Sequence, residues 1–193
     1  MKSPLFLFMV FLLVAGCGYQ WQDPEHLPTL SIPLVSQDED GLLTAELMEA
    51  MSKSGSAKVV SEGGEYTLKV CVLGEKTEKI GFRVDPQKID HKIREHLLAT
   101  EARRCLDVDV FLYQGEKLVF GPYRIQSSAE YDYVDGDSIQ DLAFVDRSGN
   151  LIPVLPFSLG QLEPSESASL AASSSLYKDL ARKVVHGVCR KLK

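Results

Sequence analysis

Strict alternation of apolar and polar side chains over residues 106–113 constrains the fold of this chain most strongly. The apolar positions of this stretch are Leu106, Val108, Val110 and Leu112. Successive side chains of a strand point to opposite faces of a sheet, so the pattern predicts a strand with one buried and one largely solvated face. Residues 66–73 alternate in the same way. We therefore expect a sheet that is covered on one side only.

Two further segments carry apolar side chains at the three- and four-residue spacing of amphipathic helices. The first follows the acidic turn 37–40 and ends before Gly55, and the second begins at residues 165–167. Their apolar positions are Leu43, Leu47, Met48 and Met51 in the first, and Leu176, Leu180, Val184, Val188 and Leu192 in the second. The sequence thus predicts an α+β fold, a two-layer sandwich with both helices packed on one face of a mixed, mostly antiparallel sheet.

The remaining segments give weaker predictions. Residues 30–35 predict a first strand, with Pro33 at a sheet edge or a strand end because proline lacks an N–H. A short strand is also expected at 57–60, and the strand of residues 66–73 is expected to continue past Gly74 to 80–84, by a bend or a hairpin. After a turn at 114–117, residues 118–127 predict a returning strand that bends near Gly121. Residues 85–100 fit either a short helix starting near Asp90 or a charged loop. Residues 128–166 fit no regular period and predict a long irregular loop that packs on its own domain or on a partner.

The N-terminus has the pattern of an export signal. Lys2 precedes an unbroken apolar run over residues 5–14, which Ala15, Gly16 and Cys17 follow. At about 1.5 Å per residue this run covers roughly half of a ~30 Å hydrocarbon core, so it predicts a signal peptide rather than a membrane span. The alternative to a lipidated cysteine is an ordinary signal peptide with a cysteine nearby.

Residues 13–17 resemble the lipobox of bacterial lipoproteins, whose cysteine is acylated, with palmitate among its acyl groups, and becomes the first residue of the mature chain. Pro24 and Pro28 predict an extended leader, so that the lipid-anchored leader covers 17–28, and the length of the remainder fits a single domain at 29–193. The lipobox resemblance implies a signal peptide at 1–16 that is removed. It also implies an outer-membrane location on the periplasmic face, because lipoproteins kept at the inner membrane typically carry Asp where this chain has Gly18.

Charge excludes one class of partner. The chain has a formal net charge of −6, which becomes −7 once the segment with Lys2 is removed. Nucleic acids require a basic face, so we expect no nucleic-acid partner. The same balance disfavours a polybasic grip on a membrane, which leaves the lipid at Cys17 as the expected anchor.

The sequence shows no catalytic constellation, and we expect neither enzymatic activity nor a bound cofactor or metal. Ser158 lacks the glycine that a nucleophile elbow requires. The four histidines, His26, His91, His96 and His186, are scattered. Asp132, Asp135, Asp137 and Asp141 lack the spacing and closing glutamate of a Ca²⁺ loop, so we expect a solvated acidic loop. Cys71, Cys105 and Cys189 permit at most one disulfide, and buried free thiols are equally compatible with the sequence.

A basic segment in this acidic chain is the one candidate ligand site. It comprises Lys79, Arg83, Lys88, Lys92 and Arg94, with Asp85 and Asp90 as the only acids between its ends. Such a segment could contact the phosphate groups of a glycolipid. The alternative is a solvated loop with scattered basic side chains.

The order of parts resembles the LPS-assembly lipoprotein (LptE) family. Cys17-Gly18-Tyr19 opens the mature chain, a strand ending at Ile32-Pro33 leads into a helix that stops at a glycine, and long strands precede a C-terminal helix with Leu176, Tyr177, Leu180 and Val184 on it. The residues 128–166 depart from the shorter family members. The resemblance implies a non-enzymatic role as plug and chaperone of an LptD-like outer-membrane β-barrel that delivers lipopolysaccharide to the cell surface. The alternative is a periplasmic lipoprotein that scaffolds the envelope or assists a transporter, without a lipopolysaccharide role.

Overall fold

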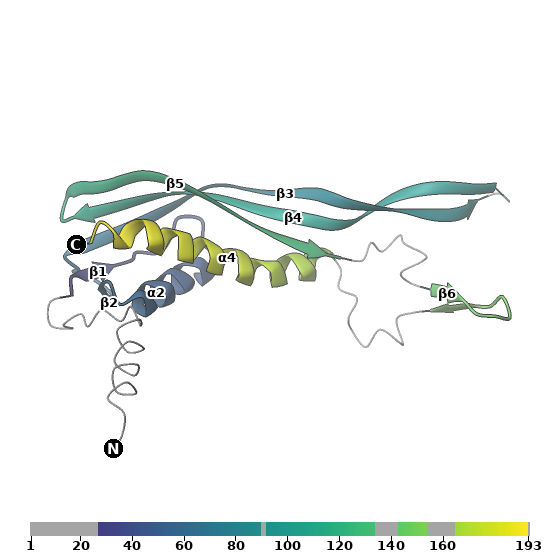
Figure 1. Cartoon of the computed structure of the whole chain (residues 1–193), viewed down its shortest axis with the longest axis horizontal. Coiled ribbons are helices and arrows are strands. Elements are labelled where there is room, and N and C mark those ends of the chain that lie inside the picture. Colours follow the sequence, from purple (N-terminus) through teal and green to yellow (C-terminus); the bar gives the residue numbers. More distant parts are fainter. Residues whose placement is uncertain (1–26, 90–91, 134–142, 154–164, 193) are drawn as a thin grey trace, which may run out of the picture.

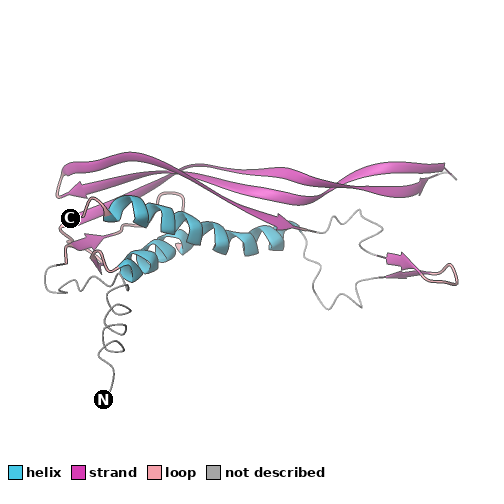
Figure 2. Ribbon diagram, viewed as in Figure 1, coloured by secondary structure: helices cyan, strands magenta, loops and turns pink. Residues whose placement is uncertain are grey.

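The protein is a two-layer α+β structure, as the sequence predicts. The computed structural model describes residues 27–89, 92–133, 143–153 and 165–192. Its sheet has five strands in the order β2-β1-β3-β4-β5, and both helices lie on the same side of it (Figure 1, Figure 2). The elements of this body are β1 Thr29–Ser31, α2 Leu42–Ser54, β2 Lys58–Val60, β3 Tyr66–Ile89, β4 Lys92–Gln114, β5 Lys117–Asp132 and α4 Ser165–Cys189.

The sheet is mixed because β1 is parallel to both of its neighbours. Thr29 to Ser31 pair with Lys58 to Val60 of β2 on one side and with the start of β3 on the other. The pairs β3–β4 and β4–β5 are antiparallel. Pro33 lies just beyond the end of β1, so the prediction of a strand end is confirmed. The prediction of a sheet edge is wrong, because β1 lies between two strands.

Helix α2 begins and ends as the sequence predicts. The carboxylate of Asp38 accepts hydrogen bonds from the backbone N–H of Leu43 and Thr44, at 3.3 and 2.8 Å, and from the Thr44 hydroxyl at 2.7 Å. An acid at this end satisfies N–H groups that have no partner within the helix. At the other end Gly55 adopts a left-handed conformation with φ of 64°, which glycine tolerates best.

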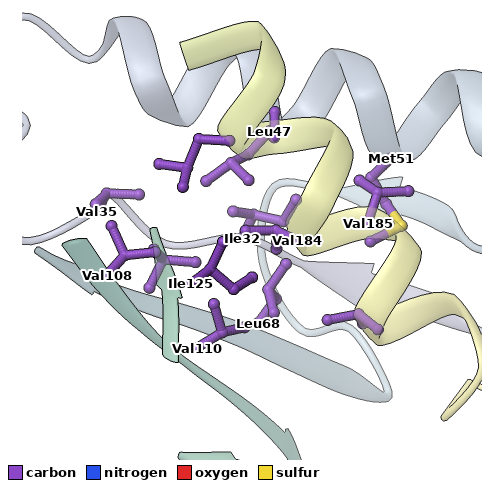
Figure 3. Packing of buried hydrophobic residues seen from close by; sticks show 14 of the residues in the cluster. Ile32, Val35, Leu47, Met51, Leu68, Val108, Val110, Ile125, Val184 and Val185 are labelled. Carbon is purple, nitrogen blue, oxygen red and sulfur yellow. The ribbon is translucent and has the colours of Figure 1, made fainter. Parts of the chain in front are cut away.

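The core lies between the helices and the inner face of the sheet. Figure 3 shows Leu47 and Met51 of α2 and Val184 and Val185 of α4 packed toward Leu68, Val108, Val110 and Ile125 of the sheet. The alternating set of β4 predicted from sequence is buried, with Val108, Val110 and Leu112 fully inaccessible. Burial of each such side chain contributes about 1.5–3 kcal/mol.

The hairpin of β3 and β4 is longer than predicted. β3 has 24 residues and β4 has 23, and the two run together beyond the N-terminal end of α4 (Figure 1). The prediction of a helix or a charged loop at 85–100 is wrong, since β3 continues to Ile89 and β4 starts at Lys92. Register shifts between Val72 and Gly74 and between Lys79 and Phe82 mark bulges where the hairpin bends.

The predicted loop at 128–166 contains regular structure. Residues 128–132 belong to β5, which pairs with β4 as far as Asp132 opposite Glu101. Strands β6 Ala143–Val145 and β7 Leu151–Pro153 form a second, two-stranded sheet, and α4 already begins at Ser165. The prediction of a loop is thus wrong for residues 128–132, because pairing with β4 holds residues that show no clear alternation.

Candidate functional site

The predicted lipid anchor, Cys17, lies outside the described residues, so its acylation stays a prediction. In the part of the chain that the structure describes, no helix is both long enough and apolar enough to span a membrane. The described chain starts at Leu27, two residues before β1, at the end of the sheet far from the tip of the long hairpin (Figure 1).

The basic segment lies along the distal part of the β3–β4 hairpin. Lys79, Arg83 and Lys88 belong to β3, and Lys92 and Arg94 belong to β4. In the register, Lys88 pairs with Ile93, and Lys92 pairs with Ile89. Lys79 and Lys88 are nine residues apart on one strand, which corresponds to roughly 30 Å. The hairpin register thus brings Lys88, Lys92 and Arg94 close together and leaves Lys79 far from them. The five basic residues therefore do not converge on a single phosphate.

Lys79 and Arg83 are the two members whose side chains the structure describes. Lys79 is exposed and pairs in register with Ala102. Arg83 is half-buried and lies opposite Leu98, which is only 4% exposed. The side chains of Lys88, Lys92 and Arg94 lie outside the described part of the structure.

An apolar strip on the same hairpin was missed by the sequence analysis. Phe82, Val84 and Leu97 are 54, 49 and 63% exposed. Val84 lies directly opposite Leu97, and Phe82 lies opposite Ala99, so the three side chains share one face of the hairpin. The sequence predicts a strand at 80–84 but not that residues 92–99 pair with it, and only this pairing brings the three side chains together.

The outer face of the body differs from this strip. Arg124 binds Asp109 through two hydrogen bonds of 3.0 and 3.1 Å, and Arg103 binds Glu130 at 2.5 Å. These contacts lower the pKa of the Asp109 carboxyl and raise the pKa of both arginines, chiefly through the hydrogen bonds. Lys69 lies over the ring of Tyr113, 5.0 Å from its centroid. On this face Arg124, Arg103 and Lys69 thus each contact a side chain of a neighbouring strand.

Two polar contacts hold α4 to the sheet. Arg104 of β4 pairs with Glu75 of β3 and donates to Ser173 of α4, and its side chain is 13% exposed. The Asp179 carboxylate accepts from Ser127 of β5 at 2.6 Å and pairs with Lys183 at 2.6 Å. The Lys183 hydrogen bond, followed by that of Ser127, lowers the pKa of Asp179 to about 2.

Two hollows open beside the helices. One, of about 100 Å³, is lined by residues that include Asp38, Glu75 and Tyr177, and the other, of about 390 Å³, by residues that include Ser54, His186 and Cys189. The thiol of Cys189 lies 3.7 Å from the Ser54 hydroxyl. Among the described residues that line either hollow, no hydrogen bond between a nucleophile and a base is present.

The structure describes only some of the other sequence candidates. Cys71, Cys105 and Cys189 are free and half-buried. Asp132 ends β5, whereas Asp135, Asp137 and Asp141 lie outside the described residues, as do His26 and His91. Among the described residues, no three His, Cys, Asp or Glu side chains are placed to hold a metal ion.

Comparison with known proteins gives only distant structural likeness. No protein-family model matches the sequence, and no curated protein matches it as a relative. A minor lipoprotein from Acinetobacter baumannii superposes with a TM-score of 0.44 at 11% identity, over 84% of this chain and 91% of that one. The hypothetical protein CT253 from Chlamydia trachomatis gives 0.43 at 9% identity, over 86% and 98%. Rare lipoprotein B from Shewanella oneidensis gives 0.42 at 12% identity, over 84% and 94%. Likeness at this level does not assign the chain to a family, so its function has to be inferred from its own residues.

Proposed function

We propose that this chain is an exported lipoprotein, anchored through a lipid on Cys17 at the periplasmic face of the outer membrane. The observation that carries the proposal is the N-terminal sequence, an apolar run of ten residues that ends in Ala15, Gly16 and Cys17. Gly18 favours the outer membrane, because the residue after the lipidated cysteine directs lipoproteins of this type.

The proposal extends to a non-enzymatic role in lipopolysaccharide assembly, as plug and chaperone of a β-barrel translocon. The order of parts along the chain supports it, as does a basic segment carried on a hairpin that projects from a stable body (Figure 2). In this role the body would steady the barrel, and the basic segment would meet the phosphates of the glycolipid in transit. Envelope scaffolding or transporter assistance at the inner membrane is the competing role.

Two experiments test the proposal. Metabolic labelling with a fatty-acid analogue should modify the native chain and leave Cys17→Ala unlabelled and released from membranes. Labelling that persists in Cys17→Ala would refute the anchor. Crosslinking in the intact envelope, followed by membrane fractionation, should recover an outer-membrane β-barrel with the native chain. Recovery of inner-membrane transporter components instead would favour the competing role.

A further inference from the structure

Three large apolar side chains on one face of the distal hairpin are exposed, although the small Ala99 of that face is 5% exposed. Leu98 is 4% exposed, whereas its neighbour Leu97, which points to the other face, is 63% exposed. Val84, opposite Leu97, and Phe82, two positions along the strand, extend the open face into the apolar strip defined above. A two-stranded ribbon is marginally stable in water by itself, and apolar side chains grouped on one exposed face mark a contact surface.

The charge of the segment that carries the strip indicates an anionic occupant. Residues 79–97 contain five Lys and Arg and three Asp and Glu, a net of +2 in a chain whose net is −6. The apolar strip therefore lies on a segment with a net positive charge, whereas the rest of the chain has a net negative charge. An anionic surface is attracted to this end of the molecule and repelled by the remainder.

The composition of the strip favours a lipid surface over a folded protein partner. Large apolar side chains bordered by Lys and Arg are the set found at the boundary between lipid headgroups and acyl chains. Such a boundary adapts to the ribbon and requires no preformed groove.

We propose that the apolar strip is a membrane contact, which lies on an anionic lipid bilayer with Phe82, Val84 and Leu97 among the upper acyl chains and Lys79 toward the phosphates. The contact is interfacial and does not span the bilayer. It goes beyond the proposed function, because it requires neither a β-barrel partner nor lipopolysaccharide and does not depend on the lipid at Cys17.

Tryptophan fluorescence tests this contact directly. The chain has a single tryptophan, Trp21, so Phe82→Trp in a Trp21→Phe background places one reporter on the strip. Mixing this protein with phosphatidylglycerol-rich vesicles should shift the emission to shorter wavelength. Bromine-labelled acyl chains should then quench it, because bromine quenches only on close approach. Leu170→Trp in the same background is the matched control, since Leu170 is 70% exposed but lies on α4.

Each outcome decides the proposal. Quenching at position 82 without quenching at position 170 supports the contact, and its loss in phosphatidylcholine vesicles supports the anionic preference. An unquenched reporter at 82, equal quenching at both positions, or equal quenching in phosphatidylcholine overturns it. A blue shift at 82 that depends on protein concentration without vesicles also overturns it, because a second copy would then cover the strip.

A charge on the strip gives an independent test. Leu97→Asp in the Phe82→Trp reporter protein should lower the vesicle partition coefficient about tenfold or more. Leu170→Asp in the same protein should leave it within about twofold. Unchanged partition of the Leu97→Asp protein would contradict the proposal. Failure here would not affect acylation of Cys17 or recovery of a barrel, which are measured in cells.

Discussion

The long β3–β4 hairpin passes through two different environments. Near the helices its side chains stabilise the core, and beyond them its side chains are available for contact with a partner. Near the helices, Val108 and Val110 are fully buried beneath α2 and α4. Beyond the helices the same two strands continue, yet Val84 and Leu97 are about half exposed. One backbone arrangement therefore serves as a core layer at one end and as a projecting ribbon at the other.

The open faces of the two regions also differ. The outer face of the body carries the ion pairs Arg124–Asp109 and Arg103–Glu130, which contribute little to stability because solvent screens them. The distal strip groups Phe82, Val84 and Leu97 on one face. A partner that contacts the ion pairs must replace their polar contacts, whereas one that contacts the strip removes apolar surface from water. The strip is the better docking surface for this reason.

The largest contrast should come from truncating one leucine in each region. Leu180 is fully buried between α4 and the sheet, whereas Leu97 is on the strip. Leu180→Ala should lower the free energy of unfolding by about 3 kcal/mol, because it removes buried apolar contacts and leaves a cavity. Leu97→Ala should change it by less than about 0.5 kcal/mol. Urea unfolding measures both, and comparable losses would mean that the distal hairpin is part of the cooperative core.

A glycine pair should give the next largest contrast. A Cβ at Gly64 would lie 2.7 Å from the backbone nitrogen of Ser31 and 2.9 Å from the carbonyl oxygen of Tyr66, where β1 meets β3. Gly64→Ala should therefore cost about 2 kcal/mol, since backbone atoms must move. A Cβ at Gly74 would meet no atom within 4 Å, so Gly74→Ala should keep the native melting temperature. A melting temperature unchanged by Gly64→Ala would show that β1 can shift without loss.

Two neighbouring arginines test which face of β4 holds α4. Arg104 is largely buried and joins Glu75 to Ser173, whereas Arg103 pairs with Glu130 on the outer face. Arg104→Ala should destabilise by about 2 kcal/mol, because Glu75 and Ser173 lose their partner. Arg103→Ala should leave the free energy of unfolding nearly unchanged, because solvent screens its exposed pair with Glu130.

Hydrogen exchange should locate the effect of Arg104→Ala. Amide protection should fall over residues 165–177 of α4 and stay unchanged in β5. Equal loss of protection in the Arg103→Ala protein would show that the contact with Ser173 does not hold the helix.

The sequence predicted the elements of the body because burial imposes a period on them. The four-residue spacing from Leu176 to Leu192 and the alternation of residues 106–112 both record a side that faces the core. The same reasoning failed at residues 85–100. There Asp90, Ile93 and Leu97 are spaced as in a helix, and the apolar residues do not alternate with polar ones. Pairing with residues 82–89 decides the structure of this segment, and that contact is not local in sequence.

Local sequence patterns could not predict the strand order or the apolar strip either. The position of β1 depends on parallel pairing with residues 58–60, and Pro33 alone could not distinguish an edge from a strand end. The basic residues were visible in sequence, but their distribution along a ribbon was not. The apolar strip requires Val84 and Leu97 to face each other, which only the hairpin register reveals.

The smallest expected effect is a loss of stability at low pH that comes from Asp179, which links α4 to β5. The pKa of Asp179 falls from 3.8 to about 2 through the Lys183 and Ser127 hydrogen bonds. A carboxyl whose pKa is lower in the folded state stabilises the protein above its unfolded pKa, and this stabilisation is lost as the pH falls from about 4 through 2.

The Asp179 side chain is 28% exposed, so solvent screening reduces the contribution to about 1 kcal/mol. Urea unfolding from pH 5 to pH 2 should show a loss in the native protein that is about 1 kcal/mol smaller in Asp179→Asn and in Lys183→Met. Lys178→Met, which changes an exposed lysine of the same helix, should retain the full loss. An identical acid dependence in all four proteins would show that Asp179 does not couple α4 to β5.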